Sequence, residues 1–483
     1  MTSAVTTSLK ELLLNEFKQS IDSATTNYYV GISRSEPFAE GTDLSSPYSQ
    51  SQFRHAMQAV KRTSANSYVV PMITWSEASD PNNLNNGVIS EFDNGPGTDY
   101  YVLNSLDEVF ICIQTGREVD GSLKPSLVEP TEAQATAYLP SYAKARTFKT
   151  KDGLGVADGY LWRRVYGLSN LAIATFKTSD WLPVKNIASR SSFVNGFIPI
   201  PEESLQSNLQ DSARPGEILT LAIDDPGTNY TTAPTITIAG NGQDASFTCK
   251  INAGSIVRID IDSDQAGLIT GHGIGYDYAS AEVTGNAVLR PVIGPKEGIN
   301  GNVVEAVKAS RLMLQTDFTG DEFDTILAEN QFNQIGLIAN LKDFGANTVF
   351  DDNTAIALKT LTLNSTTSPP TGTFTENELI QDGGQVAKGK VMFYDAATYT
   401  LYYYQDETTG FSPFNLAQPG ISNTAIPPTA GGTIIAVNDP VVDPYSGKIL
   451  YINNNGGDNT TVTNGITRED TQTEDIRIVI GLG

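Results

Sequence analysis

Short apolar runs, each ended by a cluster of turn-forming residues, recur along most of this chain. Examples are YVVPMITW (68–75), DEVFICIQ (107–114) and EDIRIVI (474–480), which are rich in β-branched and aromatic residues. Such runs predict strands, and 42 Gly and 24 Pro supply the turns between them. No apolar run approaches the roughly 18 residues of a membrane-spanning helix. We therefore expect a mainly β (β-rich α+β) fold of several domains, with a β-sandwich-like core and a few short helices.

Three segments have the pattern of helices. Residues 8–21 carry apolar side chains at helical spacing after a Ser8/Glu11 capping pair, and residues 50–62 repeat this spacing at Phe53, Met57 and Val60. A short helix is expected after Asn302, which has Glu305 three residues on. The first segment lacks the basic start and long apolar stretch of a secretory signal, so we expect a protein made in a cytoplasm.

Changes in composition divide the chain into five parts. Two strand-dense blocks, 205–290 and 366–436, interrupt segments of mixed character at 1–204, 291–365 and 437–483. The first block contains a degenerate repeat of the form GxxYxxxPxxxIxG on either side of a hairpin, which predicts short β-modules with Gly at tight turns. The second block predicts a small barrel or sandwich whose hairpin turns at DAAT (395–398). We expect one interrupted core that carries two inserted β-modules.

The charge and the scarcity of His and Cys exclude several classes of function. The net charge of −24 leaves no broad basic surface for nucleic acid. Two His and two Cys cannot form a His-rich or thiolate metal site. Cys112 and Cys249 each lie in an apolar run, so two separate buried thiols are expected rather than one long-range disulfide.

No catalytic constellation stands out. His55 and His272 belong to no nucleophile elbow, and a surface or structural role is expected for each. Asp260, Asp262 and Asp264 alternate as in a calcium loop, but the required Gly and Glu positions are not both present. A strand with Ile259 and Ile261 facing inward is the preferred interpretation of that segment, and a weak ion site of another geometry stays open. We expect no catalytic residue, no cofactor and no metal.

Eight motifs nevertheless follow one another in an order that resembles one known family. They are NYYVGISRSEPF (27–38), LDEVFICIQ (106–114), PSLVEP (125–130), DGYLWRRVYGLS (158–169), DWLPV (180–184), ENQFNQIGLIANLKDF (329–344), GKILYINNN (447–455) and EDIRIVI (474–480). The series resembles the baseplate wedge protein encoded by gene 8 of T-even-type contractile-tail bacteriophages, above all its enlarged form in phages of cyanobacteria. Each motif is weak alone, and together they span most of the chain.

The resemblance implies a structural component of the virion tail baseplate with no enzymatic activity, assembled in the host cytoplasm. It implies a homodimer that connects other wedge proteins, the counterparts of the products of genes 6, 7 and 10, with no nucleic-acid or membrane partner. The motif residues are expected to be architectural: Arg34 and Glu36 as a pair beside the turn at Pro37, Asp158-Gly159 as a turn, and large or close-packed positions at Tyr160, Trp162, Trp181, Phe332, Ile335 and Gly336.

Two features depart from the family and leave alternatives open. The blocks 205–290 and 366–436 have no obvious counterpart in the shortest family members, and the polar loop 453–470 replaces a more apolar stretch. A receptor- or carbohydrate-binding tail protein is the alternative function, because Tyr-rich strands such as YTLYYYQ (399–405) could stack on sugars. A hydrolase with paired carboxylates is a distant third, since no pair is singled out.

Overall fold

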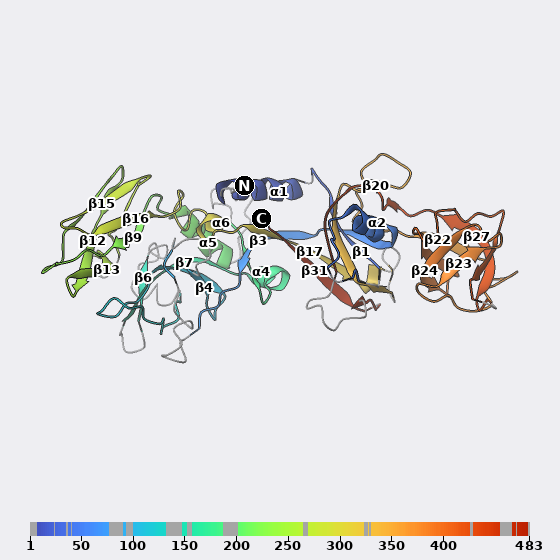
Figure 1. Ribbon diagram of the computed structural model, residues 1–483, viewed down its shortest axis with the longest axis horizontal. Helices are drawn as coiled ribbons and strands as arrows, with labels where there is room; N and C mark the ends of the chain where they lie inside the picture. Colours follow the sequence, from blue (N-terminus) through green and yellow to red (C-terminus); the bar gives the residue numbers. More distant parts are fainter. Residues whose placement is uncertain are drawn as a thin grey trace. The chain divides into compact units, whose positions relative to one another are not determined.

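A computed structural model shows a chain in which strands far outnumber helices (Figure 1). The structure describes residues 7–481 except 24, 35–36, 40, 77–89, 93–99, 132–146, 152–156, 187–200, 264–268, 323–326, 328–329, 426–427, 455–465 and 470. Within these residues it has 31 strands and five α-helices. The predicted fold class is confirmed, because the protein is mainly β and contains several separate sheets.

The chain forms two compact units. The first unit combines Met1–Asn66 with Leu314–Ile480, and the second combines Ser67–Met313 with Gly481–Gly483. The divisions fall within β3 (Ala65–Pro71), within β17 (Arg311–Thr319) and before the last residue of β31 (Thr473–Gly481). The predicted boundaries kept 1–204 in one core, whereas the structure divides that segment between the two units.

A five-stranded antiparallel sheet forms the centre of the first unit. Its order is β21 (Thr354–Ile356), β2 (Met57–Arg62), β1 (Tyr28–Ser33), β19 (Gln334–Ala339) and β29 (Lys448–Asn454). Gly31 of β1 lies directly opposite Gly336 of β19, and the Phe53 ring packs over both glycines. Helix α2 (Pro47–His55), capped by Ser46, carries that ring. The cluster beneath it includes Tyr29, Met57, Val60, Ile338 and Phe350.

One predicted helix is wrong over its second half. Helix α2 ends at His55, and the residues from Met57 to Arg62, expected to continue the helix, form strand β2 instead. Because β1 supplies backbone partners for this segment, tertiary pairing overrides the helical spacing. The other two helices are confirmed: α1 covers Thr7–Asp22, and α6 covers Val303–Ala306 with the Asn302 side chain accepting from the Glu305 N–H at 3.2 Å.

A closed six-stranded antiparallel barrel follows in the first unit. Its strands, in order around the barrel, are β22 (Lys359–Leu363), β25 (Thr400–Tyr404), β24 (Lys388–Asp395), β23 (Leu379–Asp382), β26 (Gly420–Asn423) and β27 (Gly431–Asn438). The hairpin predicted at 395–398 is confirmed, since β24 pairs with β25. The barrel has its own core, which includes Leu361, Ile380, Val391, Leu401 and Tyr403. The block predicted at 366–436 lies within this range.

The second unit contains a four-stranded antiparallel sheet in the order β4 (Tyr101–Leu103), β5 (Glu108–Gln114), β7 (Ala157–Gly167) and β6 (Phe148–Lys151). Every residue of β5 is buried, and alternate side chains enter two different clusters. Cys112 belongs to one of these clusters, and Cys249 lies in the other. Both thiols are free, which confirms the prediction of two separate buried cysteines.

Residues 218–293 of the second unit form a module of four strand pairs. These are β9 (Ile218–Asp225) with β16 (Val288–Ile293), β10 (Ile236–Gly240) with β15 (Ala279–Val283), β11 (Gln243–Ala245) with β14 (His272–Ile274), and β12 (Phe247–Asn252) with β13 (Ser255–Ile261). Strand β10 belongs to the first copy of the sequence repeat and β15 to the second. The two copies therefore pair with each other and form one structural piece.

The remaining elements complete both units. The second unit also has α4 (Asn170–Phe176), β8 (Trp181–Val184), which pairs with β3, and α5 (Pro201–Asp211). The first unit also has η3 (Gly320–Glu322), β31 (Thr473–Gly481), the pair β18 (Gln331–Phe332) and β30 (Ile466–Thr467), and the pair β20 (Lys342–Asp343) and β28 (Val442–Asp443).

Candidate interaction surface

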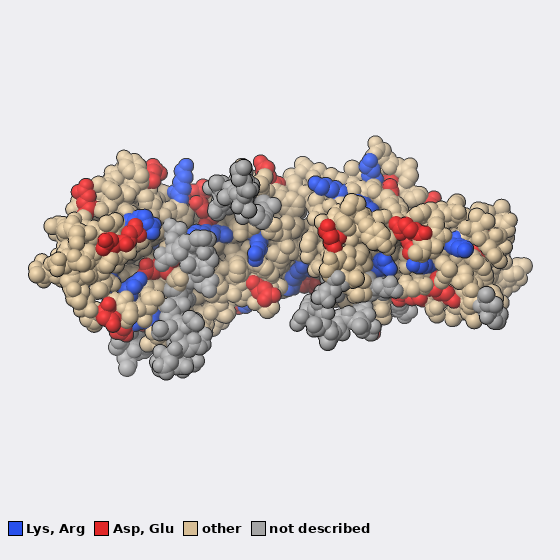
Figure 2. All heavy atoms as spheres, viewed as in Figure 1, with Lys and Arg blue, Asp and Glu red and all other residues tan. Residues whose placement is uncertain are grey.

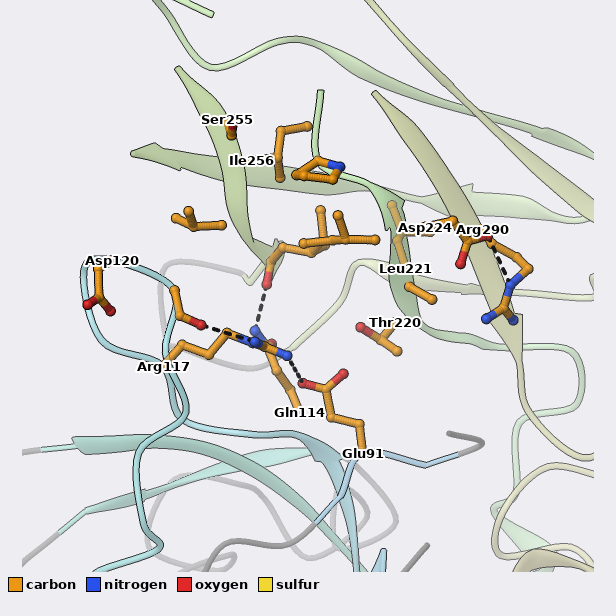
Figure 3. A pocket seen from close by; sticks show the side chains of 16 residues that line it. Glu91, Gln114, Arg117, Asp120, Thr220, Leu221, Asp224, Ser255, Ile256 and Arg290 are labelled. Atoms are coloured by element: carbon orange, nitrogen blue, oxygen red, sulfur yellow. Dashed lines mark hydrogen bonds and ion pairs between the residues drawn. The ribbon is translucent and has the colours of Figure 1, made fainter. Parts of the chain in front are cut away.

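A surface hollow lies where the loop after β5 meets the repeat-bearing module, entirely within the second unit (Figure 3). Its volume is about 590 Å³. The floor is aliphatic and comes from strands β9 and β13, with Leu221, Ile256 and Ile259 among its residues. Gly121 of the loop rests on Val257, because a Cβ at Gly121 would lie 2.9 Å from the Val257 Cβ. This contact brings the loop close to the module.

Both arginines at the hollow have carboxylate partners there, whereas Asp120 accepts from Ser122. Arg117 donates to the Gly121 carbonyl at 3.1 Å and lies 3.6 Å from a Glu91 oxygen, while Arg290 donates to Asp224 at 3.2 Å (Figure 3). No aromatic side chain occurs among the described residues that line the hollow. Because sugars are usually held by stacking on aromatic rings, the hollow lacks the main feature of a carbohydrate site.

A second depression, here called the basic groove, lies on the other side of Gln114 and Arg117 and has a volume of about 540 Å³. One wall is the outward face of β12 and β13, and the other comes from β6, β7 and the loop after β5. Five basic side chains line it: Arg117, Lys124, Lys149, Lys250 and Arg258. Three Asp side chains, Asp158, Asp260 and Asp262, share the groove. The sequence interpretation missed this site because it considered only the charge of the whole chain.

A buried polar network fixes the module against the four-stranded sheet. Arg163 of β7 forms an ion pair with Glu217, just before β9, and both side chains are 2% exposed. Arg214 reaches the other Glu217 oxygen at 3.0 Å. Burial opposes ionisation of Glu217, but Arg163 and other neighbouring positive groups outweigh it and lower the pKa of this carboxyl. An ion pair between two buried side chains therefore holds the module, which forms one wall of the groove, against the four-stranded sheet.

His272 belongs to the same network. Its Nδ1 lies 2.9 Å from the Ile218 carbonyl, which can only accept, so this nitrogen carries the proton. The Nε2 lies 2.9 Å from the Thr147 hydroxyl oxygen. The same oxygen accepts a hydrogen bond from Arg163 at 3.0 Å. His272 is therefore buried and hydrogen-bonded rather than at the surface, and its expected structural role stays a prediction.

His55 lies at the end of α2 in the first unit, with its ring centroid 5.4 Å from that of Phe411 and 5.7 Å from that of Tyr445. Glu407 lies 3.6 Å from its Nδ1. Burial lowers the pKa of His55, although the charge of Glu407 partly offsets this effect. These contacts place the imidazole in a packed aromatic setting.

Of the possible calcium segment, Asp260 belongs to strand β13 and Asp262 follows the end of that strand. Ile259 and Ile261 of β13 are buried, as predicted, while Asp260 accepts from Arg258 and Asp262 accepts from Ser246. Asp264 lies outside the described residues. Across the described part of the chain, no group of three or more His, Cys, Asp or Glu side chains could hold a metal ion.

The first motif is only partly described. Arg34 donates to the Gln52 side chain at 2.9 Å, which ties the end of β1 to α2. Pro37 is exposed just beyond. Glu36 lies outside the described residues, so the expected pairing of Arg34 with Glu36 stays a prediction.

The DGYLW motif forms the start of β7, so the turn predicted at Asp158-Gly159 is wrong and both residues lie within a strand. Asp158 Oδ1 accepts from the Thr150 hydroxyl at 2.7 Å, and Gly159 follows with a φ of +94°, a conformation that favours glycine. Tyr160 and Trp162 are fully buried, with ring centroids 5.7 Å apart. The Tyr160 hydroxyl donates to the Lys124 carbonyl at 2.5 Å, whereas Trp162 Nε1 has no partner among the described residues.

The remaining motif residues are spread over both units. In the second unit, the guanidinium of Arg311 lies 4.7 Å from the centre of the Trp181 ring. In the first unit, Phe332 is fully buried and Ile335 is half-buried. At Gly336, a Cβ would lie 2.5 Å from Phe53 Cζ, so a side chain cannot be accommodated without movement.

The motifs themselves come together as paired strands. NYYVGIS, FNQIGLIAN and GKILYINN supply β1, β19 and β29, which are consecutive in the five-stranded sheet. LDEVFICIQ and DGYLWRRVYG supply β5 and β7, which are neighbours in the four-stranded sheet. The chain matches no protein-family model and no curated protein. No helix in the described residues is long and apolar enough to span a membrane.

Proposed function

We propose that this protein is a structural component of a contractile phage tail, a dimeric connector in the baseplate wedge. The observation that carries the proposal is the pairing of the resembling motifs. Segments separated by about three hundred residues, around Gly31 and Gly336, are adjacent strands of one sheet. Neighbouring positions in shared sheets are the arrangement expected if these motifs belong to one common framework.

The two blocks without counterparts in short family members are organised differently. The barrel closes on itself around its own core, and residues 218–293 pair internally as four two-stranded pieces. Neither block supplies a strand to the sheets that the motifs build. This arrangement is expected of a shared framework into which modules have been inserted, as the resemblance implies.

The surface chemistry fits a protein that associates with other proteins. On the face drawn in Figure 2, both signs of charge occur and charged side chains are scattered among uncharged ones. The net charge of −24 keeps free subunits soluble and favours neighbours with basic or neutral faces. If electrostatic attraction between subunits drives assembly, the affinity between them should change measurably with salt concentration.

Two measurements test the proposal. Light scattering of the full chain at micromolar concentration should give twice the mass of one 51.8 kDa chain, and a single chain mass would contradict the dimer. A density map of an assembled contractile tail should contain this fold in the baseplate. A tail whose baseplate density excludes the five-stranded sheet and the barrel would overturn the structural role.

A further inference from the structure

The basic groove is an exception in an acidic protein. The chain has 31 Lys and Arg against 55 Asp and Glu, yet the groove has five basic side chains against three acidic ones. Three of the five are engaged by nearby carboxylates: Arg117 with Glu91, Lys124 with Glu118, and Arg258 with Asp260. Lys149 and Lys250 have no ion-pair partner in the described part of the chain. Two ammonium groups are thus available to a ligand.

The strand register concentrates this charge. Lys250 of β12 lies directly opposite Arg258 of β13, and both side chains leave the same face of the hairpin. Like charges at directly opposed positions destabilise a strand pair. Asp260 engages the Arg258 guanidinium, with Nε donating at 2.6 Å, but Lys250 receives no such contact. Repulsion between Lys250 and Arg258 therefore destabilises the hairpin, and an anionic ligand would relieve this repulsion.

The three Asp residues decide which kind of anion fits. A nucleic acid presents a phosphate at every nucleotide, so its chain would meet Asp158, Asp260 and Asp262 along with the cations. An acidic protein segment can place carboxylates beside the lysines and neutral residues beside the Asp side chains. The mixed charge of the groove, and the acidity of the chain as a whole, favour the protein segment.

The groove is also held in a defined shape. Gln114 of β5 donates to the Ile259 carbonyl of β13 at 2.6 Å, which links the two walls directly. Below, the buried Arg163–Glu217 pair fixes the module to the sheet. A preformed site loses less conformational entropy on binding than one that must be ordered.

We propose that the basic groove binds an acidic, extended segment of a partner protein, with Lys149 and Lys250 as the principal contacts. The proposal does not depend on the baseplate assignment, because it rests on the charge and shape of the groove alone. Carboxylates of the segment would reach the two ammonium groups that face the groove from opposite walls. Screening by salt should weaken such binding, since both lysines are exposed.

The test uses the full chain and a fluorescent peptide of alternating Glu and Ser, about eight residues or roughly 26 Å long when extended. Fluorescence anisotropy should show saturable binding that weakens with salt, and no binding of the matching Gln-Ser peptide. The double variant K149Q/K250Q should weaken binding by roughly fivefold or more, the effect of losing two exposed ion pairs. Circular dichroism should show that the variant keeps its fold.

The double variant K185Q/K448Q is the matched control, because it removes two exposed lysines outside the groove and changes the net charge equally. It should bind the acidic peptide as the unaltered protein does. Equal losses in both variants would show a general charge effect and overturn the proposal. Absence of peptide binding, or tighter binding of a single-stranded oligonucleotide of similar length through Lys149 and Lys250, would overturn it as well.

Discussion

The Tyr230 hydroxyl lies over Gly285 and accepts the backbone N–H of Ala287 at 2.9 Å and of Asn286 at 3.1 Å. Tyr230 belongs to the first copy of the sequence repeat, and Gly285 closes the second. The same contact occurs in the other direction, since the Tyr276 ring of the second copy lies against Gly242 of the first. Each Tyr of the repeat thus packs on a glycine of the other copy, which explains why the motif contains both residue types.

Removing the Tyr230 hydroxyl should destabilise the module. Y230F removes the acceptor of two backbone N–H groups that water can partly reach, and we expect a loss of about 0.5–1.5 kcal/mol in the free energy of unfolding measured with urea. Y276F is the matched control, since the Tyr276 hydroxyl makes no hydrogen bond among the described residues, and it should change stability little. Equal effects of the two variants would contradict the assigned role of the Tyr230 hydroxyl.

A side chain at Gly285 should be more harmful. G285A would place a Cβ 2.5 Å from Tyr230 Cε1, at a residue whose φ is +127°. We expect a loss of roughly 1–3 kcal/mol from the contact and the backbone strain together. Combining G285A with Y230A should recover the part due to the contact, and a double-mutant cycle measures that part. Strict additivity of the two variants would show that ring and glycine do not interact.

The Gly31–Gly336 pair offers a similar test in the first unit. G336A would place a Cβ 2.5 Å from Phe53 Cζ, and we expect a destabilisation of about 1–3 kcal/mol by overpacking. G420A in the barrel is the control, because a Cβ there meets no atom closer than 3.6 Å. Thermal unfolding should show a lower midpoint for G336A than for G420A. The reverse order would refute the close packing of Phe53.

Part of this fold could be predicted from the sequence because alternation and turn residues are local signals. They indicated the strands around Val109 and the hairpin at 395–398. The pairing of Gly31 with Gly336 has no local signal, since the partners lie far apart in the chain. The motifs indicated only that both segments belong to one framework.

The error after His55 has a clear physical cause. Phe53, Met57 and Val60 have helical spacing, and all three do reach the same core. They reach it from a helix and then a strand, because β2 is buried on both faces at Met57–Val60 and therefore shows no alternation. The spacing correctly identified core residues and misidentified the backbone that presents them.

The basic groove was hidden for a different reason. Its cations come from segments that are distant in sequence, such as Lys149 and Lys250, and each segment alone is unremarkable in charge. Only the register of β12 with β13 and the packing of the loop after β5 bring them together. A net charge summed over the chain conceals such a local reversal of sign.

The two thiols should be unreactive in the folded protein. Burial raises the pKa of Cys112 well above its usual value and also raises the pKa of Cys249, and only the thiolate reacts. We expect no rapid reaction with a thiol reagent under native conditions and reaction of both thiols in denaturant. Two thiols that stayed unreactive in denaturant without reductant would instead indicate a disulfide.

The pair formed by Arg163 and Glu217 should make stability depend on pH. The pKa of Glu217 is lower in the folded protein than its usual value of 4.5, so its ionised form stabilises the fold above that pH. This contribution should be lost as the pH falls from 4.5 through the lowered pKa of the folded state. The measurement is the free energy of unfolding as a function of pH, compared with the variant E217Q.

E217Q should be less stable than the unaltered protein by about 3–5 kcal/mol near neutral pH, because Arg163 is left buried without its counter-charge. Its stability should then fall less on acidification, since the group that takes up the proton is absent. E282Q is the matched control: Glu282 is exposed on β15 of the same module and makes no ion pair with any described residue. If E282Q reduced the loss of stability on acidification as much as E217Q does, the pH dependence would arise from the general charge of the chain rather than from the buried pair.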